Sequence, residues 1–143
     1  MYTKCSDPST HMGICLAPGW SQDYPDPYTF GVPLFSSAYL FPSYGNLALV
    51  GADAEYLKKY EYTVSSVPSA DEKISECKAA AGDARTTCWA ELDRLLMEEI
   101  VPWVPYLFDN NIDLLSERIS NYSFDQFASL AAYDQMAIAA DQQ

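Results

Sequence analysis

The chain is organised around Gly19-Trp20-Ser21-Gln22-Asp23-Tyr24-Pro25-Asp26-Pro27-Tyr28-Thr29-Phe30. This stretch follows a short apolar run, Met12 to Leu16, whose length and flanking turn residues predict a strand. Pro25 and Pro27 exclude regular strand pairing, and each restricts the preceding residue to extended backbone. We therefore predict a stiff, irregular loop at a strand end, rich in aromatic rings and carrying two carboxylates.

Local pattern supports two interpretations of this loop equally. Aromatic rings and acids gathered on a rigid loop are typical of a binding site. In the alternative, the aromatic rings belong to the core, and Asp23 and Asp26 accept hydrogen bonds from nearby backbone amides, as in Asx-turns. The residue pattern alone leaves both interpretations open.

Two blocks of sequence resemble the extracellular solute-binding proteins of family 5, the peptide- and nickel-type receptors that supply ABC importers. The first block is Trp-x-x-Asp-Tyr-x-Asp-Pro, beginning at Trp20, followed by Leu34-Phe35. The second block, from Glu91 to Tyr106, is similar to a late helix of that family leading into a Pro-aromatic-Val-Pro strand. The two blocks span most of the chain and occur in the family's order.

The resemblance implies a mixed α/β fold, the C-terminal segment of a periplasmic-binding-protein type II fold. Family members are several times longer, so the chain is expected to be a fragment that is incomplete on its own. Residues 1–108 would belong to the second, C-terminal ligand-binding lobe, and residues 109–143 would return towards the first lobe. A sheet cut from a larger lobe keeps unpaired edges, which predicts self-association.

The implied function is solute capture for ABC-type import, without catalysis, and the ligand class stays open. No cofactor and no metal-ligating residue are predicted. Trp20 and Asp23 match family positions that line the ligand cleft, and Tyr24 is predicted to bind ligand with them. In peptide-binding members the acid at the Asp23 position pairs with the ligand's α-ammonium. The expected partners are a peptide or other small solute and, for the full-length parent, an ABC permease. The expected location is the extracellular side of a bacterial membrane, periplasmic or lipid-anchored, with any export signal ahead of this part.

Charge and composition narrow the class of partner independently of the resemblance. The net charge is −12, with 8 Lys and Arg against 20 Asp and Glu, which argues against binding nucleic acid or an anionic membrane. Apolar residues make up 49% of the chain and aromatic residues 14%, a composition typical of a globular protein. No apolar run approaches the length of a membrane span.

The four cysteines are predicted to form disulfides. Cys-x-x-Cys spacing is absent, and the single histidine, His11, is better interpreted as a polar loop residue than as a metal ligand or base. Four cysteines allow three connectivities, but two helices meeting near Gly82 would bring Cys77 opposite Cys88. Cys5 and Cys15 then form the other pair, across a turn. Disulfides in turn imply an oxidising compartment.

Local signals predict the remaining elements. We expect a hairpin over residues 1–18, a short helix from the Asp26 cap through Phe35, a helical turn or two within 53–62, and helices that begin at a Ser69 capping box and at Asp83. Strands are expected at 103–108 and 112–115, with a turn at 109–111 between them. Residues 124–140 fit a helix or a late strand. Asn121-Tyr122-Ser123 fits a glycosylation acceptor, which has no role in a bacterial receptor.

The sequence leaves two alternatives to solute capture. The first is a small secreted, disulfide-bonded interaction domain that oligomerises through its aromatic residues. The second, more distant, is a glycoside hydrolase using Asp23 and Asp26, since such enzymes place two carboxyl groups roughly 5–9.5 Å apart with one pKa raised. Hydrolase, P-loop and dinucleotide-binding motifs are absent from the sequence.

Overall fold

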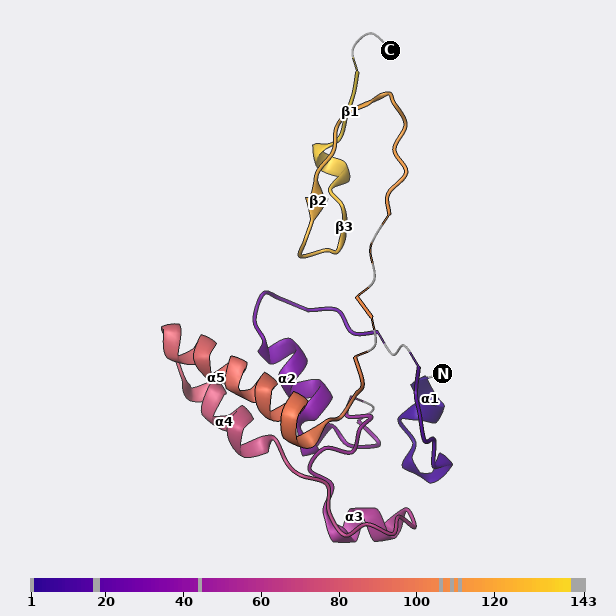
Figure 1. The fold of residues 1–143 in the computed structure, drawn as a ribbon, viewed down its shortest axis with the longest axis vertical. Coiled ribbons are helices and arrows are strands. Elements are labelled where there is room, and N and C mark those ends of the chain that lie inside the picture. Colours follow the sequence, from indigo (N-terminus) through magenta and orange to yellow (C-terminus); the bar gives the residue numbers. More distant parts are fainter. Residues whose placement is uncertain are drawn as a thin grey trace. The chain divides into compact units, whose positions relative to one another are not determined.

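The computed structural model describes residues 2–16, 19–43, 45–105, 107–108, 110 and 112–139. The chain divides into two compact units, Met1–Val104 and Pro105–Gln143, each of which is described by itself (Figure 1). The assignment of these two parts to lobes of a larger receptor stays a prediction. None of the described helices is both long enough and apolar enough to cross a bilayer.

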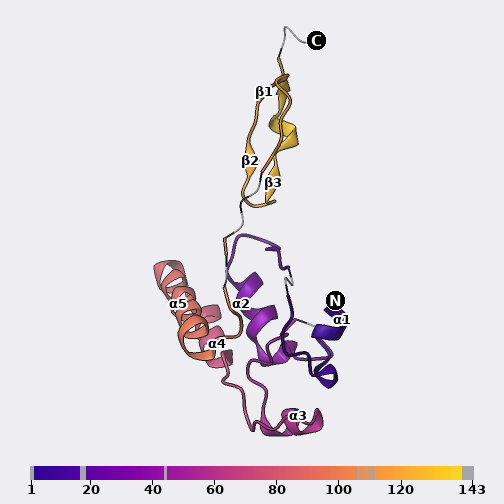
Figure 2. The ribbon, with the colours of Figure 1, turned by 45° about the vertical axis from the view of Figure 1, so that its right-hand side comes forward.

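The described part of the first unit is built from helices and irregular segments, without a strand. Figures 1 and 2 show α4 and α5 lying side by side, with α2 next to them. The elements, in chain order, are α1 (Tyr2–Cys5), η1 (Pro8–Thr10), α2 (Tyr28–Phe35), η2 (Ser37–Tyr39), α3 (Ala54–Lys59), α4 (Asp71–Ala79), α5 (Gly82–Leu95) and the π-helical turn η3 (Leu96–Ile100).

The hairpin predicted over residues 1–18 is wrong in the described part of that range, as is the strand from Met12 to Leu16. Asp7 instead starts the 3-10 turn η1, because its carboxylate accepts the backbone N–H of Ser9 at 2.9 Å. Ile14 is 77% exposed, and the described part of this unit offers no strand that could pair with its segment. An apolar run without a partner strand cannot complete its backbone hydrogen bonds as a sheet.

The short helices follow their local signals closely. Asp26 accepts the backbone N–H of Tyr28 at 2.8 Å at the start of α2, and Asp53 accepts that of Tyr56 at 2.8 Å at the start of α3. Both predicted helices are confirmed, including the proline inside α2, Pro33. A carboxylate at these positions satisfies N–H groups that have no partner within the helix.

The α4–α5 hairpin is confirmed, although its ends differ in detail. The Ser69 hydroxyl accepts the N–H of Asp71 at 3.1 Å rather than that of the residue expected in a capping box. Gly82, with a φ of +55°, opens α5, whereas α4 already ends at Ala79. Both predicted disulfides are present: the Cα atoms of Cys77 and Cys88 are 5.3 Å apart, and those of the Cys5–Cys15 pair are 6.0 Å apart.

The core of the first unit lies where α2, α4 and α5 meet. Gly31 allows this packing, because a Cβ atom there would lie 2.6 Å from the Trp89 ring. Buried Asn46 fixes the connection after α2: its side-chain amide donates to the carbonyls of Ser36 and Val50 and accepts the N–H of Val50. The buried cluster consists of Val32, Phe35, Val50, Ala70, Ile74, Cys77, Cys88, Trp89, Leu92 and Leu96.

The described part of the second unit contains four very short strands and one 3-10 turn. β1 (Ile119–Asn121) pairs antiparallel with β4 (Ala137–Ile138), and β2 (Phe124–Asp125) pairs antiparallel with β3 (Leu130–Ala131). η4 (Tyr133–Gln135) precedes β4. The tail therefore forms strands. Among the described residues, the predicted strands at 103–108 and 112–115 are wrong; the turn predicted between them falls partly on residues 109 and 111, which lie outside the described residues.

Candidate ligand pocket

An apolar pocket of about 350 Å³ lies within the first unit. This volume is at the small end of the range for ligand sites, roughly 300–1,000 Å³. The lining combines the loop before α2, α2 itself, the segment after η2 and the chain following α5, and its described residues include no charged side chain. The lining residues are Gly19, Trp20, Phe30, Leu34, Phe35, Gly45, Leu47, Ala48, Pro102 and Trp103.

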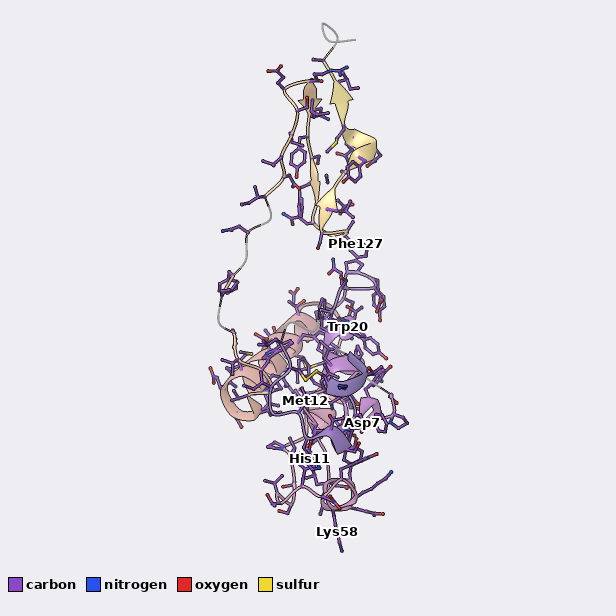
Figure 3. The ribbon with its side chains drawn as sticks, turned by 90° about the vertical axis from the view of Figure 1, so that its right-hand side faces the viewer. Asp7, His11, Met12, Trp20, Lys58 and Phe127 are labelled. Carbon is purple, nitrogen blue, oxygen red and sulfur yellow. A yellow bond between two sulfur atoms is a disulfide. The ribbon has the colours of Figure 1, made fainter. Side chains whose placement is uncertain are left out.

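Trp20 is held in the pocket wall by a hydrogen bond that a proline makes possible. Its indole Nε1–H donates to the Thr29 carbonyl at 2.7 Å (the side chain is labelled in Figure 3). In a regular helix this carbonyl would accept the N–H of the residue four positions later, which is Pro33. Because proline has no N–H, the carbonyl stays available inside α2 and the indole takes it.

Trp103 forms a second part of the wall from the other end of the unit. Its ring meets the buried Phe35 ring edge to face, with centroids 5.1 Å apart and an interplanar angle of 88°. Its Nε1–H donates to the Met97 sulfur at 3.1 Å. Aromatic pairs of this geometry are favourable beyond the area they bury. Both pocket tryptophans remain partly exposed, Trp20 at 43% and Trp103 at 47%.

Gly45 brings the segment after η2 close against α2. A Cβ atom at this position would lie 2.2 Å from the Pro33 carbonyl oxygen, a distance that real side chains do not reach. Gly45 is buried and lines the pocket, together with Leu47 and Ala48. The absence of a side chain at residue 45 thus sets the shape of this wall.

The structure separates the three predicted ligand-binding residues. Trp20 lines the pocket, whereas Asp23 and Tyr24 are exposed and lie outside its lining. Ligand contact by Trp20, Asp23 or Tyr24 stays a prediction, and none of the described lining residues offers a carboxylate for a ligand ammonium group.

Asp26 forms an ion pair that sequence reasoning did not find. The Arg85 guanidinium binds both carboxylate oxygens, with Nη2 at 2.9 and 3.0 Å and Nε at 3.2 Å. These hydrogen bonds from Arg85, together with the N–H of Tyr28, hold the pKa of Asp26 below its ordinary value despite partial burial. A glycosidase acid needs a raised pKa, so Asp26 in this pairing is unsuited to that role.

Arg85 ties the loop that carries Trp20 to the disulfide-linked helices. Besides Asp26, its guanidinium donates through Nη1 to the carbonyls of Cys77, at 2.7 Å, and Lys78, at 3.3 Å. It also lies 5.5 Å from the centre of the Trp89 ring, a cation–π distance. One side chain thus joins the end of α4, the body of α5 and the loop before α2.

The sequence did not predict that Trp103 and Phe35 line the pocket or that Arg85 binds the loop before α2. Trp103 and Phe35 belong to the two sequence blocks that resemble family 5 receptors, but no local pattern indicates that they meet. A signal for the Trp20 contact was present in the sequence, since Pro33 stands four residues after Thr29. Among the described residues, no three His, Cys, Asp or Glu side chains gather as a metal site, and His11 packs against the Tyr62 ring at 4.9 Å.

No protein-family profile, curated protein or solved structure matches this chain. The resemblance to family 5 receptors therefore rests on the two sequence blocks alone.

Proposed function

We propose that the first unit is a solute-binding module that captures a small apolar or aromatic group between Trp20 and Trp103, without chemistry. The observation that carries this proposal is the apolar pocket itself, with two partly exposed indole rings in its wall. Concave sites rich in aromatic side chains are the usual form of small-molecule sites.

The hydrogen bonds of the two indole groups specify how a ligand is held. Trp20 donates its N–H to Thr29, and Trp103 donates its N–H to Met97. Neither donor is free for a ligand, so the rings offer their faces and edges. Binding then depends on apolar area, worth about 25 cal/mol per Å² buried, and on stacking, worth roughly 0.5–1.5 kcal/mol per aromatic pair.

The resemblance extends the proposal to capture for ABC-type import. The solute would be a peptide with an apolar side chain, or another small apolar solute, and the parent receptor would deliver it to a permease. The two disulfides support a location outside the reducing cytosol, as such a receptor requires.

Titration with Nile red, a neutral dye whose emission rises in apolar surroundings, tests the proposed pocket. We expect saturable binding at one site per chain, weakened about tenfold (about 1.4 kcal/mol) by Trp20→Ala and by Trp103→Ala. Tyr133→Ala is the matched control, because it removes a 74% exposed aromatic ring in the other unit. Equal affinity of all four proteins would contradict the proposal.

A second candidate function is self-association through residues 105–143. Ala131 and Ala132 are the buried apolar residues among the described part of this unit, whereas Ile112 and Leu114 are 82% and 94% exposed. Two-stranded pairs are marginally stable alone, which favours pairing with a further chain. Sedimentation equilibrium distinguishes the two candidates, because an oligomer that dissociates in Ile112→Ser with dye binding intact would support this one.

A further inference from the structure

The lining of the pocket is rich in aromatic rings. The aromatic side chains among its described residues are Trp20, Phe30, Phe35 and Trp103. The face of an aromatic ring is partly negative and attracts a cation, and tryptophan does so more strongly than phenylalanine or tyrosine. The indole N–H groups, which would repel a cation, are already bonded to the Thr29 carbonyl and the Met97 sulfur.

The stretches of chain that supply the lining carry no positive side chain. Between Lys4 and Lys58, and between Arg94 and the end of the first unit at Val104, the sequence contains no lysine or arginine. The acidic residues of the same stretches are Asp7, Asp23, Asp26, Asp53, Glu55, Glu98 and Glu99. Together with the net charge of −12, this distribution disfavours an anionic ligand and favours a cation.

The basic side chains of the first unit that contact aromatic rings use other rings. The three pairs, with the distance from the charged group to the ring centre, are Lys59 and Tyr60 at 5.1 Å, Lys78 and Tyr28 at 5.6 Å, and Arg85 and Trp89 at 5.5 Å. In the described part of the chain, no lysine or arginine lies at such a distance from Trp20 or Trp103. These two rings are therefore available to a cation from solution.

The lining also distinguishes between kinds of cation. Its described residues include no carboxylate, so a metal ion or a primary ammonium group would lose its water without gaining a charged partner. A quaternary ammonium group has no N–H to satisfy, and methyl groups form its surface, so an apolar wall suits it. We propose that the pocket binds the quaternary ammonium group of a small free solute between Trp20 and Trp103. This rests on the proposed function and names the class of solute.

The same charges argue against the headgroup of a phosphatidylcholine membrane as the source of this group. That headgroup carries a phosphate beside its quaternary ammonium, and phosphate binding relies on arginine or lysine. The stretches that supply the lining have neither residue. A free solute without a phosphate therefore fits the pocket better than a lipid.

Isothermal titration calorimetry with two probes of the same shape tests the proposal. Choline carries a trimethylammonium group, and dimethylbutanol is the neutral alcohol in which carbon replaces the choline nitrogen. We expect choline to bind at one site per chain, about tenfold more tightly than dimethylbutanol, because two indole rings attract its charge. Added salt should weaken choline binding and leave dimethylbutanol binding unchanged. Phosphocholine should bind less tightly than choline, and phosphatidylcholine vesicles should not bind.

Trp20→Leu and Trp103→Leu keep an apolar side chain in the wall but remove the ring. Each variant should lose several-fold more affinity for choline than for dimethylbutanol, whereas damage to the fold would weaken both probes alike. Tyr133→Leu is the matched control, because it removes a 74% exposed ring from the other unit. It should leave both affinities unchanged.

The possible outcomes separate this proposal from the proposed function. Equal affinity for the two probes, or choline affinity that survives in both leucine variants, would overturn the ammonium assignment while the pocket still binds a solute. Nile red binding without choline binding would do the same. Vesicle binding without choline binding would overturn the assignment to a free solute. If neither Nile red nor any of the probes bound, the proposed function would fall as well.

Discussion

The carboxylate of Asp26 and the guanidinium of Arg85 form a two-oxygen ion pair across 59 positions of sequence. Both side chains are about one-quarter exposed, so the pair is neither fully solvated nor fully buried. The same carboxylate accepts the N–H of Tyr28 at the start of α2. This pair fixes the aromatic loop, which contains Trp20, to the α4–α5 hairpin.

Asp26→Asn should lower the free energy of unfolding by about 1–2 kcal/mol, since it removes a charge-assisted pair that is partly screened by solvent. The pKa of Asp26 is below its ordinary value of 3.8 in the folded chain. Its contribution is therefore complete above pH 3.8 and is lost as the pH falls through the lowered pKa. Urea denaturation across acidic pH measures both effects.

Asp93→Asn is the control for this measurement, because Asp93 is exposed on α5. It should change stability by less than about 0.5 kcal/mol. If Asp26→Asn behaved like Asp93→Asn at neutral pH, the ion pair would not contribute to holding the loop.

Pro33→Ala tests the contact that holds Trp20. The new N–H at residue 33 can bond to the Thr29 carbonyl, in competition with the Trp20 indole. We expect the Trp20 Nε1–H to exchange with solvent faster, as followed by nuclear magnetic resonance, while α2 stays helical. The Trp89 Nε1–H provides a buried reference within the same spectrum. If the Trp20 Nε1–H exchanged at the same rate in Pro33→Ala, the missing N–H of Pro33 would not be what allows the Trp20–Thr29 hydrogen bond.

Gly45→Ala should destabilise the first unit by about 1–3 kcal/mol and weaken dye binding, because the added methyl group collides with the Pro33 carbonyl. Gly13→Ala is the matched control, since a Cβ atom there meets no other atom within 4 Å. Thermal unfolding compares the two. Similar stability in both variants would contradict the close approach of residue 45 to α2.

Replacing both Cys77 and Cys88 by Ala should lower the free energy of unfolding by about 2–3 kcal/mol, as closure of a short loop predicts. The Cys5 and Cys15 double variant loses a loop of similar length, but those residues are only partly buried, whereas Cys77 and Cys88 belong to the core. Removing the Cys77–Cys88 disulfide should therefore lower the free energy of unfolding more than removing Cys5–Cys15. Denaturant titration of both variants decides this, and a larger loss from the Cys5 and Cys15 variant would be contrary to it.

The elements that sequence predicts correctly carry their own local signals. Asp26 and Asp53 start helices through bonds to N–H groups two or three residues away, so those helices could be placed from sequence. Met12 to Leu16 also forms an apolar cluster, but a strand needs a partner, and the described part of the first unit has none. The hydrophobic pattern of one segment does not show whether another strand lies beside it in the fold.

The pocket can be predicted only in part from the sequence, because it depends on contacts between residues that are far apart along the chain. Trp20 stood out by its neighbours in sequence, whereas Trp103 enters the wall from 83 positions away through its contact with Phe35. The role of Arg85 depends on a pairing across 59 positions that no local spacing encodes. The resemblance to family 5 receptors predicts Asp23 as a ligand-binding residue, but Asp23 lies outside the pocket lining.

The most direct test of the pocket is a titration of the nitrogen-15-labelled chain with unlabelled indole, a neutral aromatic solute, followed through the tryptophan Nε1–H signals. We expect the Trp20 and Trp103 signals to shift together along one saturable curve, while the buried Trp89 signal stays in place. Trp20 and Trp103 signals that do not move up to the solubility limit of indole would contradict a ligand site between these two rings.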